Sequence, residues 1–428
     1  VLASFYAFNR KRKFRRNKFF KVGLEEIKRL ERDKKYLAEY QVHHLKEILK
    51  FSINNIPFYS NYIEYSDPFQ TLSQFPILKK KNVINNWEDF QYYPPKLKVM
   101  HSNTSGSTGT SLSLRISENC TGYERADIVS FRGRAGYKPG DKIASFIGRK
   151  IMKIDTKKPP FWRYNFIDNQ LIFSYWHLSD YTIDSYIDKL IEFNPKYIHG
   201  YPSFINLIAN FINRKKIPTI NPTAIFTSSE TLLPEQKLEI EKAFNSKIYD
   251  RYGLAEMVIS ASQCEYGEYH VNPLLGYMEI KNNKIIGTSY HNFAMPLIRY
   301  EVGDLSDFKN IKCKCGRITS IIKQPEGRKE DVIISKNGRI FGRIPHLLKG
   351  AKGILESQVV QKDYENLIIN IVPENINNII IKDINDIIKD KLGNLFNIDI
   401  QLVDYIERTP SGKFKFVKSE ISQNHDNL

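Results

Sequence analysis

Short apolar segments alternate with amphipathic helical segments between residues 122 and 250, and this alternation constrains the fold more than any other feature of the chain. Strands are predicted over residues 142–148, at the start of 197–203, and over 223–227 and 246–250. Apolar residues at helical spacing predict helices over residues 122–136, 181–194, 204–214 and 235–244. Strands and helices in this order form a largely parallel sheet with helices on both faces. Ligands of such folds bind at the carboxyl ends of the strands.

The flanking regions differ from this central pattern. Helical spacing predicts amphipathic helix over residues 24–53, ended before Pro57, and a second helix over 82–90. After residue 276 strands dominate, over 277–281, 284–288, 297–300 and 318–323. A separate α+β unit follows, with strands over 354–361, 367–372 and 398–405 and a helix over 379–392.

The predicted fold class is therefore α/β. It comprises a large N-terminal domain of layered, largely parallel sheets with helices and a β-rich subdomain, and a small mobile α+β C-terminal domain. We predict boundaries of 1–40 for a basic aromatic arm and leading helix, 41–327 for the large domain, and 328–428 for the small domain. The 41% hydrophobic content is ample for buried cores in a chain of 428 residues.

Residues 101–111 form a polar segment in which seven residues carry hydroxyl groups and two are glycine. Extended apolar residues on both sides, 98–100 and 112–116, predict a strand–loop–strand hairpin. Glycine permits positive φ, which lets successive backbone N–H groups converge on one anion, and hydroxyl groups add further donors. Taken alone, the segment could equally be a polar linker. It is not a Walker loop, because no Gly-Lys-Ser/Thr sequence closes it.

Four further motifs follow the loop in order, at residues 250–256, 299–305, 327–333 and 408–413. Each is weak by itself, but their order and spacing resemble those of the adenylate-forming superfamily of acyl-CoA synthetases. The flanking stretches at 44–49, 55–59, 75–79 and 199–203 resemble the phenylacetate–CoA ligase and CapK capsular-polysaccharide branch. The resemblance covers roughly residues 40–420 and leaves the basic arm outside.

The resemblance implies a large adenylating domain, a small lid domain and a set of nucleotide-binding residues. The implied nucleotide-binding residues are Thr104, Ser105, Gly106, Ser107, Thr108, Gly109, Thr110, Ser229, Glu230, Arg251, Tyr252, Gly253 and Asp304. Within this set, residues 104–110 would hold the β and γ phosphates, Tyr252 would pack near adenine, and Asp304 would accept both ribose hydroxyls.

The same resemblance implies three catalytic residues and a hinge. Glu256 would hold Mg²⁺, Arg328 would reach the ribose or phosphates, and Lys413 would bridge the carboxylate and the α-phosphate. Asp331 would be the hinge of the small domain. The loop ends in Thr110-Ser111, without the lysine of many relatives, which leaves more of the phosphate charge to Mg²⁺, Arg328 and Lys413.

The predicted function is ATP-dependent activation of a carboxylic acid to an acyl-adenylate, with release of pyrophosphate. The acyl group would then pass to a sugar or amine acceptor in surface-polysaccharide biosynthesis, or to coenzyme A as in phenylacetate–CoA ligases. A non-catalytic scaffold protein is the alternative of another class. By resemblance, the acid would lie near Trp176, His177, Tyr201, Pro202 and Ser203. His177 and His199 could orient a carboxylate or be structural histidines.

Four cysteines in a chain without a cleavable signal pattern argue against a disulfide framework. Cys264, Cys313 and Cys315 with His270 would supply three thiolates and one imidazole, the ligand set of a closed structural zinc site. The spacing is not that of a standard zinc finger, but members of the phenylacetate-ligase branch have similar ligands. The alternative is reduced, unpaired cysteines beside a surface histidine. Cys120 is predicted to be a buried small apolar residue.

Residues 1–21 contain eight lysines and arginines, no acidic residue and interleaved aromatic residues. On an anionic membrane surface each such cation contributes roughly 1 kcal/mol, so this segment either contacts a membrane or is a solvating arm. Co-sedimentation with vesicles separates the two alternatives. Sedimentation that is unchanged by anionic lipid or by salt would exclude electrostatic contact with a membrane. No nucleic-acid recognition module accompanies the charge. We expect a cytoplasmic protein; if the arm contacts a membrane, it does so at the inner face of the cell membrane. The oligomeric state is left open.

Overall fold

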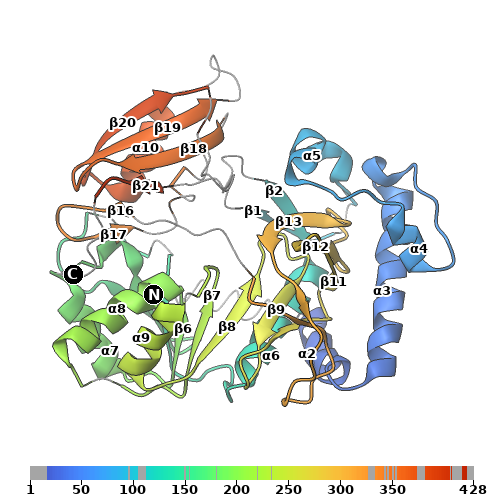
Figure 1. Ribbon diagram of the computed structural model, residues 1–428, viewed down its shortest axis with the longest axis horizontal. Coiled ribbons are helices and arrows are strands. Elements are labelled where there is room, and N and C mark those ends of the chain that lie inside the picture. The colour runs from blue at the N-terminus through green and yellow to red at the C-terminus, as the bar shows by residue number, and fades with distance from the viewer. Residues whose placement is uncertain are drawn as a thin grey trace.

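The computed structural model describes residues 17–421, apart from 95–96, 105–111, 149–150, 154, 180, 219, 233, 326–332, 342–343, 345–346, 349–350, 352–353, 374–380, 405 and 407–416. Its largest element is a ten-stranded sheet with the strand order β14-β15-β10-β9-β8-β7-β6-β3-β5-β4. Figure 1 labels β6, β7, β8 and β9 of this sheet.

The centre of this sheet is parallel, as predicted. The parallel strands are β3 (Ile143–Ile147), β5 (Gln170–Ser174), β6 (Tyr197–Gly200), β7 (Ala224–Ser228) and β8 (Ile248–Gly253). Antiparallel strands extend both edges: β4 (Trp162–Asn165) at one, and β9 (Ser260–Gln263), β10 (Tyr269–Val271), β15 (Ile321–Ile322) and β14 (Phe308–Lys309) at the other. Most of these edge strands are absent from the sequence-based prediction.

Helices cover both faces of the sheet. On one face, α7 (Ile183–Phe193), α8 (Pro202–Lys215) and α9 (Pro234–Phe244) bury a core with Phe146, Ile198 and Ile225. On the other, α6 (Glu118–Gly133) packs with the alternate residues Tyr197 and Phe226. A Cβ on Gly200 would lie 2.3 Å from the carbonyl oxygen of Phe146, so only glycine allows β6 and β3 to approach this closely.

A second body precedes and follows these elements in the chain. Its strands are β1 (Val99–Asn103) and β2 (Ser113–Ser117), which form the predicted hairpin, and the antiparallel sheet β11 (Gly276–Lys281), β12 (Lys284–Ser289) and β13 (Tyr300–Leu305). Its helices are α2 (Lys18–Leu30), α3 (Lys34–Asn55), α4 (Pro68–Ser73) and α5 (Lys80–Asn85). Helix α2 packs along α6 beside the large sheet (Figure 1).

Three boundaries differ from prediction for local reasons. The 24–53 pattern is interrupted because Asp33 accepts a hydrogen bond from the Tyr36 N–H at 3.0 Å and begins α3 as a cap. The helix predicted over 82–90 is α5 followed by a separate 3₁₀ turn, Trp87–Phe90. The strand predicted over 297–300 begins only at Tyr300, because Arg299 has a φ of 50°.

The C-terminal region has its own core. Strands β18 (Ile354–Gln361), β19 (Asn366–Pro373), β20 (Asn397–Leu402) and β21 (Val417–Ser419) form one sheet with α10 (Ile381–Leu392), and β16 (Ile333–Ile334) pairs with β17 (Ile340–Phe341). Ile369, Ile371 and Ile388 are fully buried within it. The predicted domain boundaries stay predictions.

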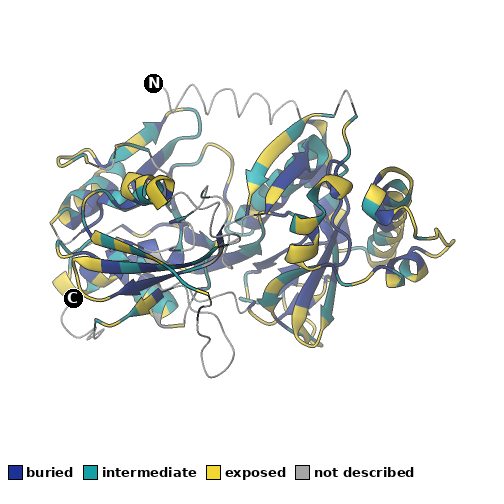
Figure 2. Cartoon of the chain, turned by 90° about the horizontal axis from the view of Figure 1, so that it is seen from above, coloured by how far each residue is buried: buried dark blue, intermediate teal, exposed yellow. Residues whose placement is uncertain are grey.

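Buried residues follow the strands of both bodies, and exposed residues lie on the outer helix faces and loops (Figure 2). Among the described helices, none combines the length and apolar character required to span a bilayer.

Candidate functional site

Two tyrosine–carboxylate pairs lie near the carboxyl end of β8. The hydroxyl of Tyr252 donates to Oδ2 of Asp304 at 2.7 Å, and that of Tyr300 donates to Oε1 of Glu256 at 3.0 Å. These four residues, here called the carboxylate cluster, come from two motifs that are separated along the chain. Tyr252 lies in β8, and Tyr300 and Asp304 lie in β13. The cluster therefore brings together three residues implied by the motifs, Tyr252, Glu256 and Asp304.

Burial raises the pKa of Glu256, the nearby positive charge of Lys80 opposes that rise, and Asp304 adds to it. Lys80 was not among the predicted site residues. It begins α5, and the preceding segment is fixed beside β13 because the Leu78 N–H donates to the Arg299 carbonyl at 2.9 Å. Two carboxylates in one partly buried site favour a divalent cation between them and a nucleotide.

The ends of the hydroxyl-rich loop are firmly held. Thr104 is buried; its N–H donates to the Leu112 carbonyl at 2.9 Å, and its Oγ1 accepts from the Leu112 N–H at 3.0 Å. The predicted residues that lie outside the described part of the chain are Ser105, Gly106, Ser107, Thr108, Gly109, Thr110, Arg328, Asp331 and Lys413.

Ser229 and Glu230 follow β7 at the same carboxyl edge of the sheet. Ser229 has a φ of 74°, a left-handed conformation uncommon outside glycine and asparagine. The chain therefore turns sharply where the parallel strands end, the position at which this fold class binds ligands.

Arg251 has a different environment from its neighbours in the motif. Its Nε donates to Oδ2 of Asp127 at 2.9 Å and its Nη2 to Oε1 of Glu124 at 2.8 Å, both on α6. All three side chains are largely buried. A Cβ on Gly253 would lie 2.3 Å from Nη1 of Arg251, so glycine leaves room for this guanidinium. Arg251 thus joins β8 to α6.

The residues assigned to the acid have different surroundings. His177 is buried: its Nε2 donates to the Lys153 carbonyl at 3.0 Å, and its Nδ1 accepts from Ser174 at 2.7 Å. Such contacts match the structural alternative for this histidine. Trp176 packs against Phe341 of the C-terminal region, with ring centroids 6.2 Å apart.

Tyr201 and Pro202 lie at the start of α8. A Cβ on Gly148 would lie 3.0 Å from the Tyr201 ring, so this ring packs closely against the end of β3. Pro202 is the first residue of the helix, where proline is favoured. Ser203 follows within α8, and its side chain lies outside the described residues.

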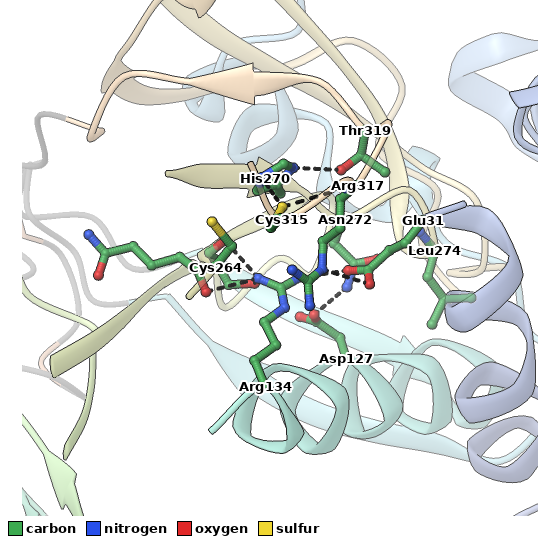
Figure 3. Close-up of polar contacts among 12 residues, drawn as sticks. Glu31, Asp127, Arg134, Cys264, His270, Asn272, Leu274, Cys315, Arg317 and Thr319 are labelled. Carbon is green, nitrogen blue, oxygen red and sulfur yellow. Dashed lines mark hydrogen bonds and ion pairs between the residues drawn. The ribbon is translucent and has the colours of Figure 1, made fainter. Parts of the chain in front are cut away.

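The four predicted metal ligands come together at the edge of the large sheet. Their ligand atoms all lie within 4.8 Å of one another. The sulfurs of Cys264 and Cys313 are 3.5 Å apart. Nε2 of His270 is 3.3 Å from the sulfur of Cys315 (Figure 3). Tetrahedral zinc with ordinary Zn–S and Zn–N bonds requires ligand separations of about 3.3–3.8 Å. The donor set and its spacing therefore fit Zn²⁺.

Further contacts orient these ligands. Backbone N–H groups of Tyr266 and Arg317 point to the sulfurs of Cys264 and Cys315, at 3.3 and 3.5 Å. Nδ1 of His270 is 3.2 Å from Oγ1 of Thr319, which leaves Nε2 for a metal. Burial, aided by Arg134 and Arg317, lowers the pKa of His270 to about 4, so the imidazole is neutral near pH 7.

Glu31, at the end of α2, links this cluster to the N-terminal helices. Its Oε1 accepts from Arg134 at 2.7 Å and its Oε2 from Arg317 at 2.9 Å. Nη1 of Arg134 also donates to the Ser262 carbonyl at 2.9 Å. The adjacent Arg32 donates to the Cys315 carbonyl at 2.9 Å. These contacts join segments far apart in sequence, and no local signal predicts them.

Comparison with known proteins identifies relatives of this chain. The CapK C-terminal domain family matches residues 332–420. Protein CapK of Staphylococcus aureus is 30% identical over 427 residues, covering 95% of this chain and 94% of that protein. Phenylacetate-coenzyme A ligase of Thermus thermophilus is 20% identical over 342 residues, covering 74% and 75%.

Among solved structures, 2-hydroxyisobutyryl-CoA ligase in complex with 2-HIB-AMP and CoA has a TM-score of 0.55 at 17% identity, covering 89% of this chain and 90% of that one. The same ligase in the postadenylation state with 2-HIB-AMP has a TM-score of 0.52, covering 92% of each chain. At this identity the likeness shows a shared fold.

Proposed function

The chain belongs to the CapK family within the adenylate-forming superfamily, and we propose that it uses MgATP to activate a carboxylic acid as an acyl-adenylate, releasing pyrophosphate. The observation that carries this proposal is the carboxylate cluster, in which Tyr252 holds Asp304 and Tyr300 holds Glu256 at the carboxyl edge of the sheet. A nucleotide needs hydrogen-bond acceptors for its ribose hydroxyls and positive charge near its phosphates. The carboxylate of Asp304 in this cluster can accept from the ribose hydroxyls directly.

In this proposal each residue of the site has one task. Asp304, oriented by Tyr252, accepts hydrogen bonds from the ribose hydroxyls. Glu256 holds Mg²⁺, which when bound neutralises phosphate charge. The hydroxyl-rich loop donates to the phosphates, Arg328 reaches the ribose or phosphates, and Lys413 brings the carboxylate and α-phosphate together. Asp331 is the proposed hinge.

The acyl group then passes to an acceptor, and we propose a sugar or amine in surface-polysaccharide synthesis, with the basic arm at the inner face of the membrane. Support for this assignment is the membership in the CapK family. Coenzyme A is the second candidate, because one relative is a phenylacetate-coenzyme A ligase.

Acid-dependent exchange of labelled pyrophosphate into ATP tests the first step. We expect exchange with at least one acid of a broad panel, and loss of exchange without Mg²⁺. Absence of exchange with every acid would favour the scaffold alternative. Mass spectrometry of the products, with and without coenzyme A, then separates the two acceptors.

We also propose that Cys264, His270, Cys313 and Cys315 hold a structural Zn²⁺. The separations of their ligand atoms and the N–H donors to two of the sulfurs support this assignment. Because Arg317 and Arg32 connect the cysteine-bearing loop to the end of α2, the occupied site would keep α2 and α3 in place.

Purified protein is therefore expected to contain about one equivalent of zinc. Its removal by a chelator should speed proteolysis between α2 and α3 and lower the melting temperature, and Glu31→Gln should make zinc loss about tenfold faster. Glu39→Gln, which changes an exposed glutamate of α3, serves as the control. Protein without zinc, or with the same cleavage pattern before and after chelation, would contradict the assignment.

A further inference from the structure

One arginine on the inner side of α6 has no acidic partner. The guanidinium of Arg132 lies over the rings of Tyr137 and Phe226, 5.6 and 5.8 Å from their centroids. Within the described part of the chain, no carboxylate forms an ion pair with it. The neighbouring arginines differ, since Arg134 pairs with Glu31 and Arg251 with Asp127. Arg132 is therefore a partly buried cation whose counter-charge the described residues do not supply.

A histidine with an unused nitrogen lies beside this arginine. His199 on β6 is the register partner of Phe226 on β7, so both side chains point to the face covered by α6. Its Nδ1 is buried and has no hydrogen-bond partner among the described residues. Burial, then the charges of Arg132 and Arg125, hold the pKa of His199 well below its usual value. The neutral ring can donate one hydrogen bond to an anion.

Arg125 completes the group, here called the basic cluster (Arg125, Arg132 and His199). It precedes Arg132 by two helical turns and faces the same side of α6. Burial, together with the charges of Arg125 and Arg251, lowers the pKa of Arg132 to about 10. The dipole of α6 stabilises a cation in its last turn by about 0.3–1 kcal/mol, but this does not account for the unused nitrogen of His199.

The basic cluster is connected to two parts of the proposed site through neighbouring residues. His199 lies two residues before Tyr201, which with Pro202 and Ser203 is implied by the resemblance to lie near the acid. On the other side, Arg251 is close enough to affect the pKa of Arg132, and the next residue, Tyr252, bonds Asp304. Partly buried like charges disfavour one another, and an anionic ligand offsets that cost. The planar guanidinium is suited to carboxylate and phosphate groups.

We propose that Arg132, with Arg125 and His199 beside it, binds a second anionic group of the acid substrate, remote from the carboxylate that becomes activated. The preferred acid then carries a carboxylate or phosphate at its far end. This inference rests on the proposed function for the identity of the ligand as substrate, whereas the anion site itself can be measured without turnover.

Calorimetric titration of the full chain with matched probes tests the site. The probes are glutarate, its neutral-ended monoamide, and 3-phosphonopropionate as the phosphate-like arm. We expect a dianion to bind at least tenfold more tightly than the monoamide, and Arg132→Met to abolish this preference while binding the monoamide unchanged. Arg132→Lys, which keeps the positive charge but not the planar guanidinium, should give an intermediate preference for the dianion. Arg163→Met, at an exposed arginine that donates only to backbone carbonyls among the described residues, is the control.

Each outcome decides the inference. It is overturned if no dianion is preferred by the unaltered protein, or if Arg132→Met binds all probes as before. Equal weakening of every probe together with a lower melting temperature would show a structural role and also overturn it. If Arg132→Met does not fold, His199→Asn and Arg132→Lys must both reduce the preference. Dianion binding without pyrophosphate exchange for any acid would leave the anion site in place and reject the proposed function alone.

Discussion

The Glu256→Gln variant is expected to lose about 10²–10³-fold in acid-dependent pyrophosphate exchange while remaining folded. The amide keeps the size of the carboxylate, and its carbonyl can still accept from Tyr300, which lies 3.0 Å from Glu256. It removes the negative charge that is proposed to hold Mg²⁺ beside the phosphates. The exchange rate as a function of Mg²⁺ concentration measures the effect, and the variant should need more Mg²⁺ for half-maximal rate.

Two comparisons separate this charge effect from a packing effect. Tyr300→Phe removes the hydroxyl that donates to Glu256 but keeps the charge, so we expect a loss below about tenfold. Glu192→Gln changes an exposed glutamate on α7 and should have no effect. Exchange by Glu256→Gln within twofold of the unaltered protein, with the same Mg²⁺ dependence, would contradict the proposed role.

The sequence predicts the centre of the fold well because its signals there are local. The apolar strands β6, β7 and β8 and the helices between them lie within a few residues of the predicted segments. The edge strands β4 and β10 are short, and β10 is defined by pairing with β9 and β15 rather than by its own periodicity. Strand pairing of that kind depends on contacts between distant segments, which single-sequence patterns do not contain.

The same distinction holds for the site. Residue type and motif order identify Tyr252 and Asp304, and the structure places their side chains 2.7 Å apart. The sequence does not identify Lys80 as a site residue, beyond its place directly after the 75–79 stretch. Lys80 comes near Glu256 because Leu78 of that stretch pairs with Tyr300 of β13. Glu31 interacts with Arg317 from 286 positions away along the chain, so the contacts that support the proposed metal ligands are found only in three dimensions.

Substituting Arg251 by methionine is expected to reduce the free energy of unfolding by about 3–5 kcal/mol, because removal of one partner leaves buried charges unpaired. The side chains of Arg251 and Asp127 are 8% and 2% exposed, and Asp127 also accepts from Ser260 at 2.9 Å. Burial already raises the pKa of Glu124, and Arg251 opposes that rise. The midpoint of urea unfolding measures the loss, with Arg163→Met as an exposed control.

The same variant decides between two roles for Arg251. The motif resemblance implies a nucleotide contact, whereas the structure directs the guanidinium to two carboxylates of α6. A supporting role predicts that the folded Arg251→Met protein binds ATP within about threefold of the unaltered chain, and that adding Asp127→Asn restores part of the stability by removing one unpaired charge. A direct contact instead predicts a loss of ATP affinity of tenfold or more, which Asp127→Asn would not restore. Because stability and affinity are measured separately, the two roles give opposite patterns. The buried ion pairs make the supporting role our expectation, in which Arg251 fixes the strand that presents Tyr252 to Asp304.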